Sequence, residues 1–486
     1  MSPLSSLITI ERTDRQSVYL QISNQIMVFI KDGILPADHR LPSTRELAGL
    51  LGVHRKTVVQ AYDELLAQGW LESHTGRGTF VAANLPILKP SGIGSQPFTN
   101  GLKTAGFSLN PASYTERPIM SYGQGLHLDD GFPDVRLAPL EELSRAYRGQ
   151  LLTGNAYTRL GYGDTKGSIW LRQQLSAYLN TSRGLHTTPE NILIVRGTIM
   201  GLYLSSNGLI SKGDSVVTGV TTWAGANTNF AQAGAKIHTI PVDEYGIDVD
   251  ALESLCQNVK IRMVYVTSHH HYPTTVALRA DRRMKLLKLA GQFGFVIFED
   301  DYDYDFHYLS KPLLPLAGAD PKGMVLYCGS FTKSIAPAFR VGYLVGAENV
   351  IDRFAGIRRI IDRQGDVVLE NAIAELLQTG VIQRHMRKSL RTYRSRRDFF
   401  CELLGSELSQ HITFQVPDGG LAVWAKFDKS VDMKAMSENA FRKGLGMSNG
   451  LGHGLPAGEN FTRLGFASSN FQELEASVQI LKGLLS

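Results

Sequence analysis

Two short apolar runs in the second half of the chain each lead into polar side chains that could do chemistry together. The runs cover residues 295–298 and 325–328, and both are continuous rather than alternating, as is typical of parallel strands covered on both faces. In open α/β sheets, ligands lie just beyond the carboxyl ends of the strands. The polar residues that follow the runs, which we expect to share one site, are Asp300, Tyr302, Ser330, Thr332, Lys333 and Arg340.

A lysine beside an aspartate, a tyrosine and an arginine suits a Schiff base with pyridoxal phosphate, formed on Lys333. Asp300 would pair with the pyridine nitrogen and Tyr302 would hydrogen-bond the ring oxygen. The groups that would hold the phosphate are those of Ser330, Thr332 and Arg340. A surface lysine beside an acidic turn is the alternative interpretation, since a lone Ser-x-x-Lys is a common pattern.

These residues, together with the run Glu299-Asp-Asp-Tyr-Asp303, resemble the fold-type I, class I and II aminotransferases. The acidic run is similar to that of the MocR-type regulators, in which such a domain follows a GntR-type winged helix. The resemblance implies an α/β chain with an N-terminal winged helix-turn-helix and a pyridoxal phosphate-dependent transferase domain of fold type I. That domain would have a large part with a mainly parallel sheet and a small C-terminal α+β part.

The N-terminal segment, residues 12–82, carries its own pattern of three helices and a hairpin. Apolar residues at helical spacing predict the helices, with a capping box at Ser43 and Glu46 and a tight turn at Gly52. The residues expected on the buried faces are Tyr19, Ile22, Ile26, Phe29, Ile30, Leu47, Ala48, Leu50, Leu51, Val58, Ala61, Tyr62, Leu65 and Leu66. Residues 71–81 predict a two-stranded wing. This order is that of a winged helix-turn-helix, although a bare structural bundle shows the same helices.

The placement of charge favours DNA binding over a bare bundle. Residues 1–83 hold eight basic and eight acidic residues, so the total charge decides nothing. The basic side chains, however, lie at the starts of the second and third helices and at the wing tip, where phosphates and the major groove are met. The candidate DNA-binding residues are Ser43, Arg45, His54, Arg55, Lys56, Thr57, Arg77 and Thr79.

This segment is similar to the GntR family, on motifs that include Leu41-Pro-Ser-Thr-Arg45 and Gly76-Arg-Gly-Thr-Phe-Val81. His54 departs from the family's usual serine and is a poorer helix cap. Residues 83–115 are rich in Pro, Gly, Ser, Thr and Asn and predict a linker, with loops ordered on the second domain as the alternative. Residues 116–486 would form the aminotransferase-like domain, with a small subdomain from about residue 370 onward.

A phosphate seat is expected after the predicted strand 192–195, where Gly197 and Thr198 open a helix with backbone amides and a hydroxyl. The resemblance implies that Trp223 stacks on the pyridine ring, with a core tryptophan as the alternative. It also places His270 in the turn that contacts the cofactor. In that turn His271 and Thr275 replace the family's Gln and Gly.

Two further roles come only from the resemblance. Tyr162 would reach the cofactor phosphate of the partner subunit, unless it is a core tyrosine. Arg463 would bind the carboxylate of an amino ligand, for which Arg is well suited, unless it forms a surface ion pair. The fold builds each site at a dimer interface, so the resemblance implies a homodimer, which a head-to-tail or domain-swapped arrangement would satisfy.

Composition excludes several classes of protein. The 486 residues contain no apolar run of the roughly 20 residues that a membrane helix needs, and the N-terminus lacks a signal pattern, so we expect a cytoplasmic protein. Three widely spaced cysteines predict free thiols. No metal is expected, because the consecutive residues His269 to His271 point to opposite sides of a strand. The basic segment 380–400 is a solvated face or, as a hypothesis, a supplementary DNA contact.

The leading hypothesis is a pyridoxal phosphate-dependent, DNA-binding transcription regulator that senses an amino compound or pyridoxal phosphate itself. One alternative is a working aminotransferase with an accessory DNA-binding head, because residues needed for half of a transamination are present. Another is a cofactor-free scaffold in which Lys333 is structural.

Overall fold

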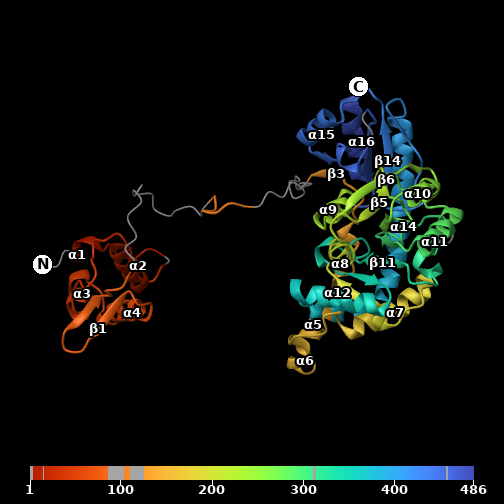
Figure 1. The fold of residues 1–486 in the computed structure, drawn as a ribbon. Helices are drawn as coiled ribbons and strands as arrows, with labels where there is room; N and C mark the ends of the chain where they lie inside the picture. The colour runs from red at the N-terminus through yellow and green to blue at the C-terminus, as the bar shows by residue number, and fades with distance from the viewer. Residues whose placement is uncertain are drawn as a thin grey trace. The chain divides into compact units, whose positions relative to one another are not determined.

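The computed structural model describes residues 4–14, 16–85, 103–109, 125–309, 314–455 and 458–485. The chain divides into two compact units, Met1–Asn110 and Pro111–Ser486, and each is considered by itself (Figure 1). Most of the linker expected at 83–115 lies outside the described residues. Within the described ranges, every helix is too short or too polar to span a lipid bilayer.

The N-terminal unit is a winged helix-turn-helix, as predicted. Its elements are α1 (Leu4–Leu7), α2 (Val18–Lys31), α3 (Thr44–Leu51), α4 (Arg55–Ala67), β1 (Leu71–His74) and β2 (Gly78–Val81). The two strands pair antiparallel, from Leu71 opposite Val81 to His74 opposite Gly78. Ile22, Ile26 and Leu47 are among the buried residues of a single core that includes side chains from all three main helices.

Local sequence fixes the ends of the two helices of the motif. Ser43 Oγ accepts a hydrogen bond from the Glu46 amide at 3.2 Å, and Glu46 Oε2 accepts one from the Ser43 amide at 3.4 Å, which completes the expected capping box. Gly52 ends α3 in the left-handed conformation, at φ 62°. His54 does cap α4, because its Nδ1 accepts the Lys56 amide at 3.2 Å. The expectation that Leu50 is buried is wrong, since it lies on the outer edge of the apolar stripe and is 47% exposed.

The centre of the second unit is a seven-stranded sheet. Its strands, in spatial order, are β4 (Ile192–Val195), β12 (Gly342–Val345), β11 (Val325–Ser330), β10 (Val296–Asp301), β9 (Ile261–Val266), β5 (Ser215–Gly219) and β6 (Lys236–Ile240). Only β12 runs antiparallel to its neighbours among these strands. The mainly parallel sheet expected from the apolar runs is therefore present.

Helices cover both faces of this sheet, which is why its strands are apolar throughout. On one face lie α8 (Thr198–Leu209), α9 (Ala224–Gln232) and α12 (Glu348–Ile361), and on the other lie α10 (Val249–Cys256) and α11 (Ala280–Phe293). Figure 1 shows α8 and α11 on opposite sides of the strands. A short ribbon, β7 (Val242–Asp243) with β8 (Gly246–Ile247), joins β6 to α10.

The C-terminal part adds a smaller α+β layer. Its three-stranded antiparallel sheet consists of β13 (Ile412–Phe414), β14 (Ala422–Phe427) and β16 (Phe461–Gly465), and its helices are α14 (Val381–Glu407), α15 (Met433–Arg442) and α16 (Phe471–Leu485). A separate parallel pair joins β15 (Leu445–Met447) to β3 (Leu126–Leu128). The remaining helices are α5 (Leu140–Leu152), α6 (Ala156–Leu160), α7 (Ile169–Arg183) and α13 (Val367–Gln378).

Removing the cap of α3 tests the local account of the DNA-binding unit. We expect Ser43→Ala to lower the stability of α3 by about 1 kcal/mol, since the Glu46 amide loses its acceptor. That difference corresponds to roughly fivefold faster hydrogen exchange of the α3 amides, which mass spectrometry of the full chain would measure. Ser73→Ala, an exposed serine of β1, is the control. Unchanged exchange in α3 of the Ser43 variant would contradict the assignment.

Candidate functional site

A cavity of about 190 Å³ lies where the parallel strands β10 and β11 end. Thirteen residues line it, namely Asp130, Phe132, Thr198, Ile199, Trp223, Tyr265, Tyr272, Asp300, Tyr302, Ser330, Thr332, Lys333 and Arg340. The register sets Asp300 opposite Cys328, so the chain leaves both strands at the same edge of the sheet. Eight residues expected at the cofactor are brought together here.

Lys333 presents an amine that is easily deprotonated. Its Nζ donates a hydrogen bond to the Gly131 carbonyl at 2.6 Å and lies 4.3 Å from the centre of the Phe132 ring. Burial lowers the pKa of the Lys333 ammonium to about 8, against the opposing attraction of Asp130 and Asp129. A lysine with such a pKa is partly a neutral nucleophile near neutral pH.

Asp300 is a buried carboxyl group with one oxygen left unpartnered. Its Oδ2 accepts a hydrogen bond from the Tyr265 hydroxyl at 2.8 Å, whereas Oδ1 has no partner among the described residues. Burial raises the pKa of Asp300 to about 7. A buried acceptor without a donor is costly, so a ligand N–H placed at Oδ1 would be stabilised there.

At the other end of the cavity, Thr198, Ser330, Thr332 and Arg340 gather groups that could hold an anion, and we call this end the anion seat. Ser330 Oγ donates to Thr332 Oγ1 at 2.7 Å, and Arg340 donates to the Arg196 carbonyl at 2.8 Å. Gly197 precedes α8 at φ 74°, and a Cβ built there would lie 2.7 Å from a guanidinium nitrogen of Arg340. Glycine therefore lets the arginine lie against the start of α8, where Thr198 adds a hydroxyl and the helix end attracts anions.

Trp223 and Tyr302 complete the walls. Trp223 stands at the start of α9, and Tyr302 follows β10 and donates its hydroxyl to the His270 carbonyl at 3.1 Å. The Arg196 side chain projects away from the cavity: it is 60% exposed, and its Nε lies 3.3 Å from Asp362 Oδ2.

Four expected residues are not among those that line the cavity. Gly197 acts only through its backbone, as described above. The buried His270 ring lies 2.8 Å from Asp303 and not at the cavity. Tyr162 is 80% exposed and packs under the Arg363 guanidinium, 4.1 Å from the ring centre. Arg463 is fully buried and forms an ion pair with Asp130, with Nε 2.9 Å from Oδ1.

The turn that holds His270 is shaped by its own partners. His269 lies 3.3 Å from Asp301, and His271 Nε2 donates to the Thr221 carbonyl at 3.1 Å. Burial lowers the pKa of His271 to about 4, so this ring is neutral. Thr275 keeps a left-handed conformation, at φ 66°, where the resembling family has glycine. The three histidine rings point to separate partners and do not converge on one point.

Sequence reasoning missed five residues of the lining. They are Asp130, Phe132, Ile199, Tyr265 and Tyr272. Asp130 and Phe132 flank Gly131 in the loop after β3, and Tyr272 lies in the turn after β9, so position in those loops was the available signal. Tyr265 reaches the cavity from within strand β9. Because the residues of that strand are nearly all apolar, the sequence did not show which of them would face the cavity.

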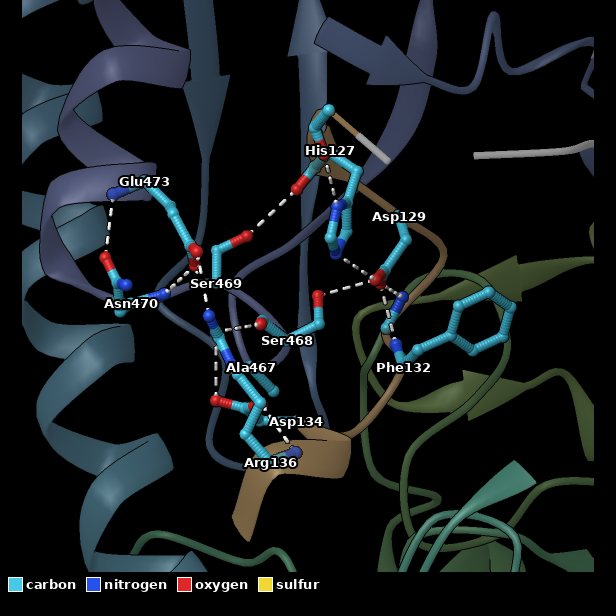
Figure 2. Close-up of polar contacts among 12 residues, drawn as sticks. His127, Asp129, Phe132, Asp134, Arg136, Ala467, Ser468, Ser469, Asn470 and Glu473 are labelled. Atoms are coloured by element: carbon cyan, nitrogen blue, oxygen red, sulfur yellow. Dashed lines mark hydrogen bonds and ion pairs between the residues drawn. The ribbon is translucent and has the colours of Figure 1, made fainter. Parts of the chain in front are cut away.

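A polar network fixes the loop that carries Asp130 (Figure 2). Asp129 Oδ1 accepts the Gly131 and Phe132 amides at 2.8 and 2.7 Å, and Asp129 Oδ2 accepts the Ser468 hydroxyl at 2.5 Å. A few residues further on, Arg136 donates to both oxygens of Glu473, at 2.8 and 3.0 Å. The loop is thus tied to the C-terminal part at two places, and the Gly131 carbonyl is held towards Lys333.

In the N-terminal unit, the candidate DNA-binding residues gather on neighbouring elements. Arg55 Nε lies 3.5 Å from Thr44 Oγ1, which brings the starts of α3 and α4 together. The Leu41 amide donates to the Thr79 carbonyl at 2.9 Å, so the wing strand adjoins the entry to α3. The members of this face with exposed side chains are Ser43, Arg45, His54, Arg55, Lys56 and Arg77, and Thr57 and Thr79 are half-buried.

The basic segment 380–400 is not uniformly a solvated face. It belongs to α14, which begins at Val381, and the structure buries two of its arginines. Arg396 lies 2.9 Å from Asp134, and Arg397 donates to the Pro417 carbonyl at 2.9 Å. The expectation of DNA contact stays a hypothesis for the exposed members, which are Arg384, Arg387, Lys388, Arg391 and Arg394.

Comparison with known families agrees with this geometry. The profile of the family Aminotransferase class I and II matches residues 120–481, and that of Bacterial regulatory proteins, gntR family, matches residues 16–81. The chain therefore belongs to the class I and II aminotransferase family and carries a gntR-type DNA-binding head. This combination is the MocR type of transcription regulator.

Individual relatives show the same two-part plan. The chain is 26% identical over 452 residues to the probable rhizopine catabolism regulatory protein MocR of Rhizobium meliloti, covering 91% of this chain and 88% of the relative. It is 27% identical over 466 residues to the transcriptional regulator TauR of Rhodobacter capsulatus, covering 92% and 93%. The solved kynurenine aminotransferase of Pyrococcus horikoshii, in complex with PMP, superposes with a TM-score of 0.69 at 26% identity and covers 75% of this chain and 92% of its own.

The protein is thus a pyridoxal phosphate-dependent, DNA-binding transcription regulator. Likeness to regulators over more than nine-tenths of the chain favours this function over a working aminotransferase with an accessory head. The cavity fits pyridoxal 5′-phosphate on its own chemistry. It offers a reactive amine, an unpartnered carboxylate oxygen for a ring N–H, and an anion seat for the phosphate.

The depressed pKa of Lys333 has a measurable consequence. Because only the neutral amine attacks an aldehyde, the rate at which cofactor-free protein takes up pyridoxal phosphate should rise with pH and level off above about pH 8. An ordinary lysine would level off near pH 10.4. Stopped-flow absorbance would follow the uptake, with Lys333→Arg as the control that takes up none covalently. A midpoint near 10 would refute the effect of burial.

Proposed function

We propose that Lys333 holds pyridoxal phosphate covalently and that Asp300 pairs with its ring nitrogen. The phosphate would lie in the anion seat, and Trp223 and Tyr302 would contact the ring and its oxygen. The residues that would form the anion seat are Thr198, Ser330, Thr332 and Arg340, with the backbone of Gly197. When bound, this cofactor would supply an electrophilic carbon at which an incoming amine can replace the lysine, and an aromatic ring that accepts electrons.

The observation that carries this proposal is the unpartnered oxygen of Asp300. That oxygen is buried in the same cavity as Lys333, and the pKa of Asp300 is raised to about 7 by burial. A protonated ring nitrogen would supply both the missing hydrogen bond and a positive charge, which would keep the carboxylate ionised. Tyr265 would hold Asp300 in place through its 2.8 Å hydrogen bond.

The same protein would work as a homodimer in the cytoplasm, where its operator is. Tyr162 is exposed on a loop of the second unit, which is compatible with its expected contact to the cofactor phosphate of a partner subunit. An amino compound, or pyridoxal phosphate itself, would act as the signal. It would do so by favouring one of two arrangements of the DNA heads, because a ligand shifts an equilibrium only through a difference in affinity for its two states.

The eight candidate residues of the N-terminal unit would contact the operator. Arg55 and Lys56 open α4, the helix expected in the major groove, and Arg77 lies at the wing tip. Ser43, Arg45, His54, Thr57 and Thr79 would complete the contacts. The half-buried Thr57 and Thr79 would approach DNA only through their outward-facing groups.

Salt dependence tests the phosphate contacts without knowledge of the operator. We expect Arg55→Ala and Lys56→Ala each to weaken binding to a random-sequence duplex. Each should also reduce the slope of log affinity against log salt concentration by about 1, because each variant would release one counterion fewer from the DNA on binding. Lys31→Ala, which removes an exposed charge at the end of α2, should change neither. Fluorescence anisotropy would measure both quantities, and equal slopes for all variants would disprove this face.

Removing the amine tests the link between cofactor and regulation. Lys333→Ala should lose the cofactor's visible absorbance, and its binding to the DNA upstream of its own gene should not respond to amines. The exposed Lys236→Ala is the matched control and should behave like the parent. If the Lys333 variant responded to amines as the parent does, the proposal would fail. Sustained turnover by the parent with an amino donor and a keto acid would instead favour a working aminotransferase.

A further inference from the structure

The charges around the cavity are divided between its two ends. Of the thirteen lining residues, four are charged: Asp130, Asp300, Lys333 and Arg340. Asp300 faces the expected ring nitrogen, and Arg340 belongs to the anion seat. Near the Lys333 amine, where an amino ligand would enter, the remaining charged lining group is therefore the carboxylate of Asp130.

Asp130 makes an ion pair through one carboxylate oxygen and accepts a hydrogen bond through the other. Oδ1 lies 2.9 Å from Arg463 Nε, and Oδ2 accepts the Tyr272 hydroxyl at 2.7 Å. The Arg463 guanidinium lies 4.8 Å from the centre of the Tyr272 ring, and its Nη1 donates to the Pro273 carbonyl at 2.8 Å. Arg463 is 1% exposed and does not line the cavity. Arg463, which was expected to bind a ligand carboxylate, is therefore already paired with the carboxylate of Asp130.

The loop that carries Asp130 is held on both sides. The Asp129 carboxylate accepts hydrogen bonds from the Gly131 and Phe132 amides and from the Ser468 hydroxyl (Figure 2). The Asp129 carbonyl accepts a hydrogen bond from the Gly465 amide at 2.8 Å. The Gly131 carbonyl in turn accepts a hydrogen bond from the Lys333 ammonium. Moving Asp130 away from Arg463 would disturb these contacts, so the ion pair belongs to a fixed loop.

A ligand carboxylate would meet an electrostatic obstacle here. To reach Arg463 it would have to displace Asp130, which would leave a carboxylate in a largely buried site without its cation. It would also bring a second negative charge beside the first, and both effects are unfavourable. A ligand with an amine and no carboxylate on the same carbon avoids both costs, and its ammonium is attracted by Asp130 before it reacts.

We propose that Asp130, by occupying Arg463, makes this site selective for primary amines that lack an α-carboxylate over the corresponding α-amino acids. This inference rests on the proposed function, since it concerns the ligand that enters beside Lys333. Asp130 is then the residue that determines specificity, and it works by excluding the wrong ligand as well as attracting the right one.

Matched pairs of ligands test the selectivity. Full-length protein loaded with pyridoxal phosphate would be titrated with cadaverine and L-lysine, and with butylamine and L-norvaline, each pair differing only by the α-carboxylate. Changes in the absorbance of the cofactor and calorimetry would give the Kd values. In the parent, each amine should bind about tenfold more tightly than its amino acid, which corresponds to about 1.4 kcal/mol.

Asp130→Asn should reverse or cancel this preference, because it removes the internal carboxylate and leaves Arg463 free to pair with the ligand. Asp130→Glu, which keeps the charge, should keep the preference for amines and shows whether the loop tolerates substitution. Glu438→Gln, which removes an exposed charge on α15, should match the parent.

Two results would overturn the inference: a parent protein that prefers the amino acids, or an Asp130→Asn variant with the parent's ratio of affinities. In either case a cofactor still attached to Lys333 would leave the proposed function standing. A parent that takes up no cofactor on Lys333 would remove both.

Discussion

The site depends on two parallel strands that end side by side. β10 delivers Asp300 and Tyr302, β11 delivers Ser330 and the turn with Lys333, and the register between the strands keeps the two sets together. Burial at this edge of the sheet shifts the pKa of both key groups. It raises the pKa of Asp300 and lowers that of Lys333, so an acid and a base are prepared for one cofactor by the same physical cause.

The antiparallel strand β12 contributes the third part of the arrangement. It returns the chain beside β11 and pairs with β4, so that Arg340 at its start lies against the turn that opens α8. A residue 144 positions away in sequence, Arg196, accepts the Arg340 hydrogen bond through its carbonyl. The anion seat is therefore assembled from three strands, and each supplies only one or two groups.

Much of this could be predicted from the sequence because the signals are local. Apolar runs ending in polar residues located Asp300, Lys333 and Arg340, and the capping box at Ser43 was visible as a spacing of three residues. The pairing of Asp130 with Arg463 was not predictable, because it joins a loop to strand β16, more than 300 positions later in sequence, and leaves no mark in either. The same reason applies to α14. The number of basic residues in that segment could not show that Arg396 would be buried and form an ion pair with the distant Asp134.

The direction of single side chains was the other limit of prediction. In the turn after β9, the sequence predicted that His270 contacts the cofactor. In the structure the His270 ring lies beside Asp303, and Tyr272 lines the cavity instead. One step along an irregular segment changes the side to which a residue points, and no periodic pattern exists there to fix it. Leu50 shows the same limit in a helix, because the edge of an apolar stripe depends on what packs against it.

The short parallel pair of β3 with β15 bears on how the chain is made. Residues 126–128 enter the second unit early, yet their partner strand is residues 445–447, more than 300 positions later. Closing so long a loop is slow and must wait until most of the polypeptide has left the ribosome. The winged unit, whose core comes from the first 85 residues, can fold during synthesis. A nascent chain would therefore carry a finished DNA-binding head before its sensory half is complete.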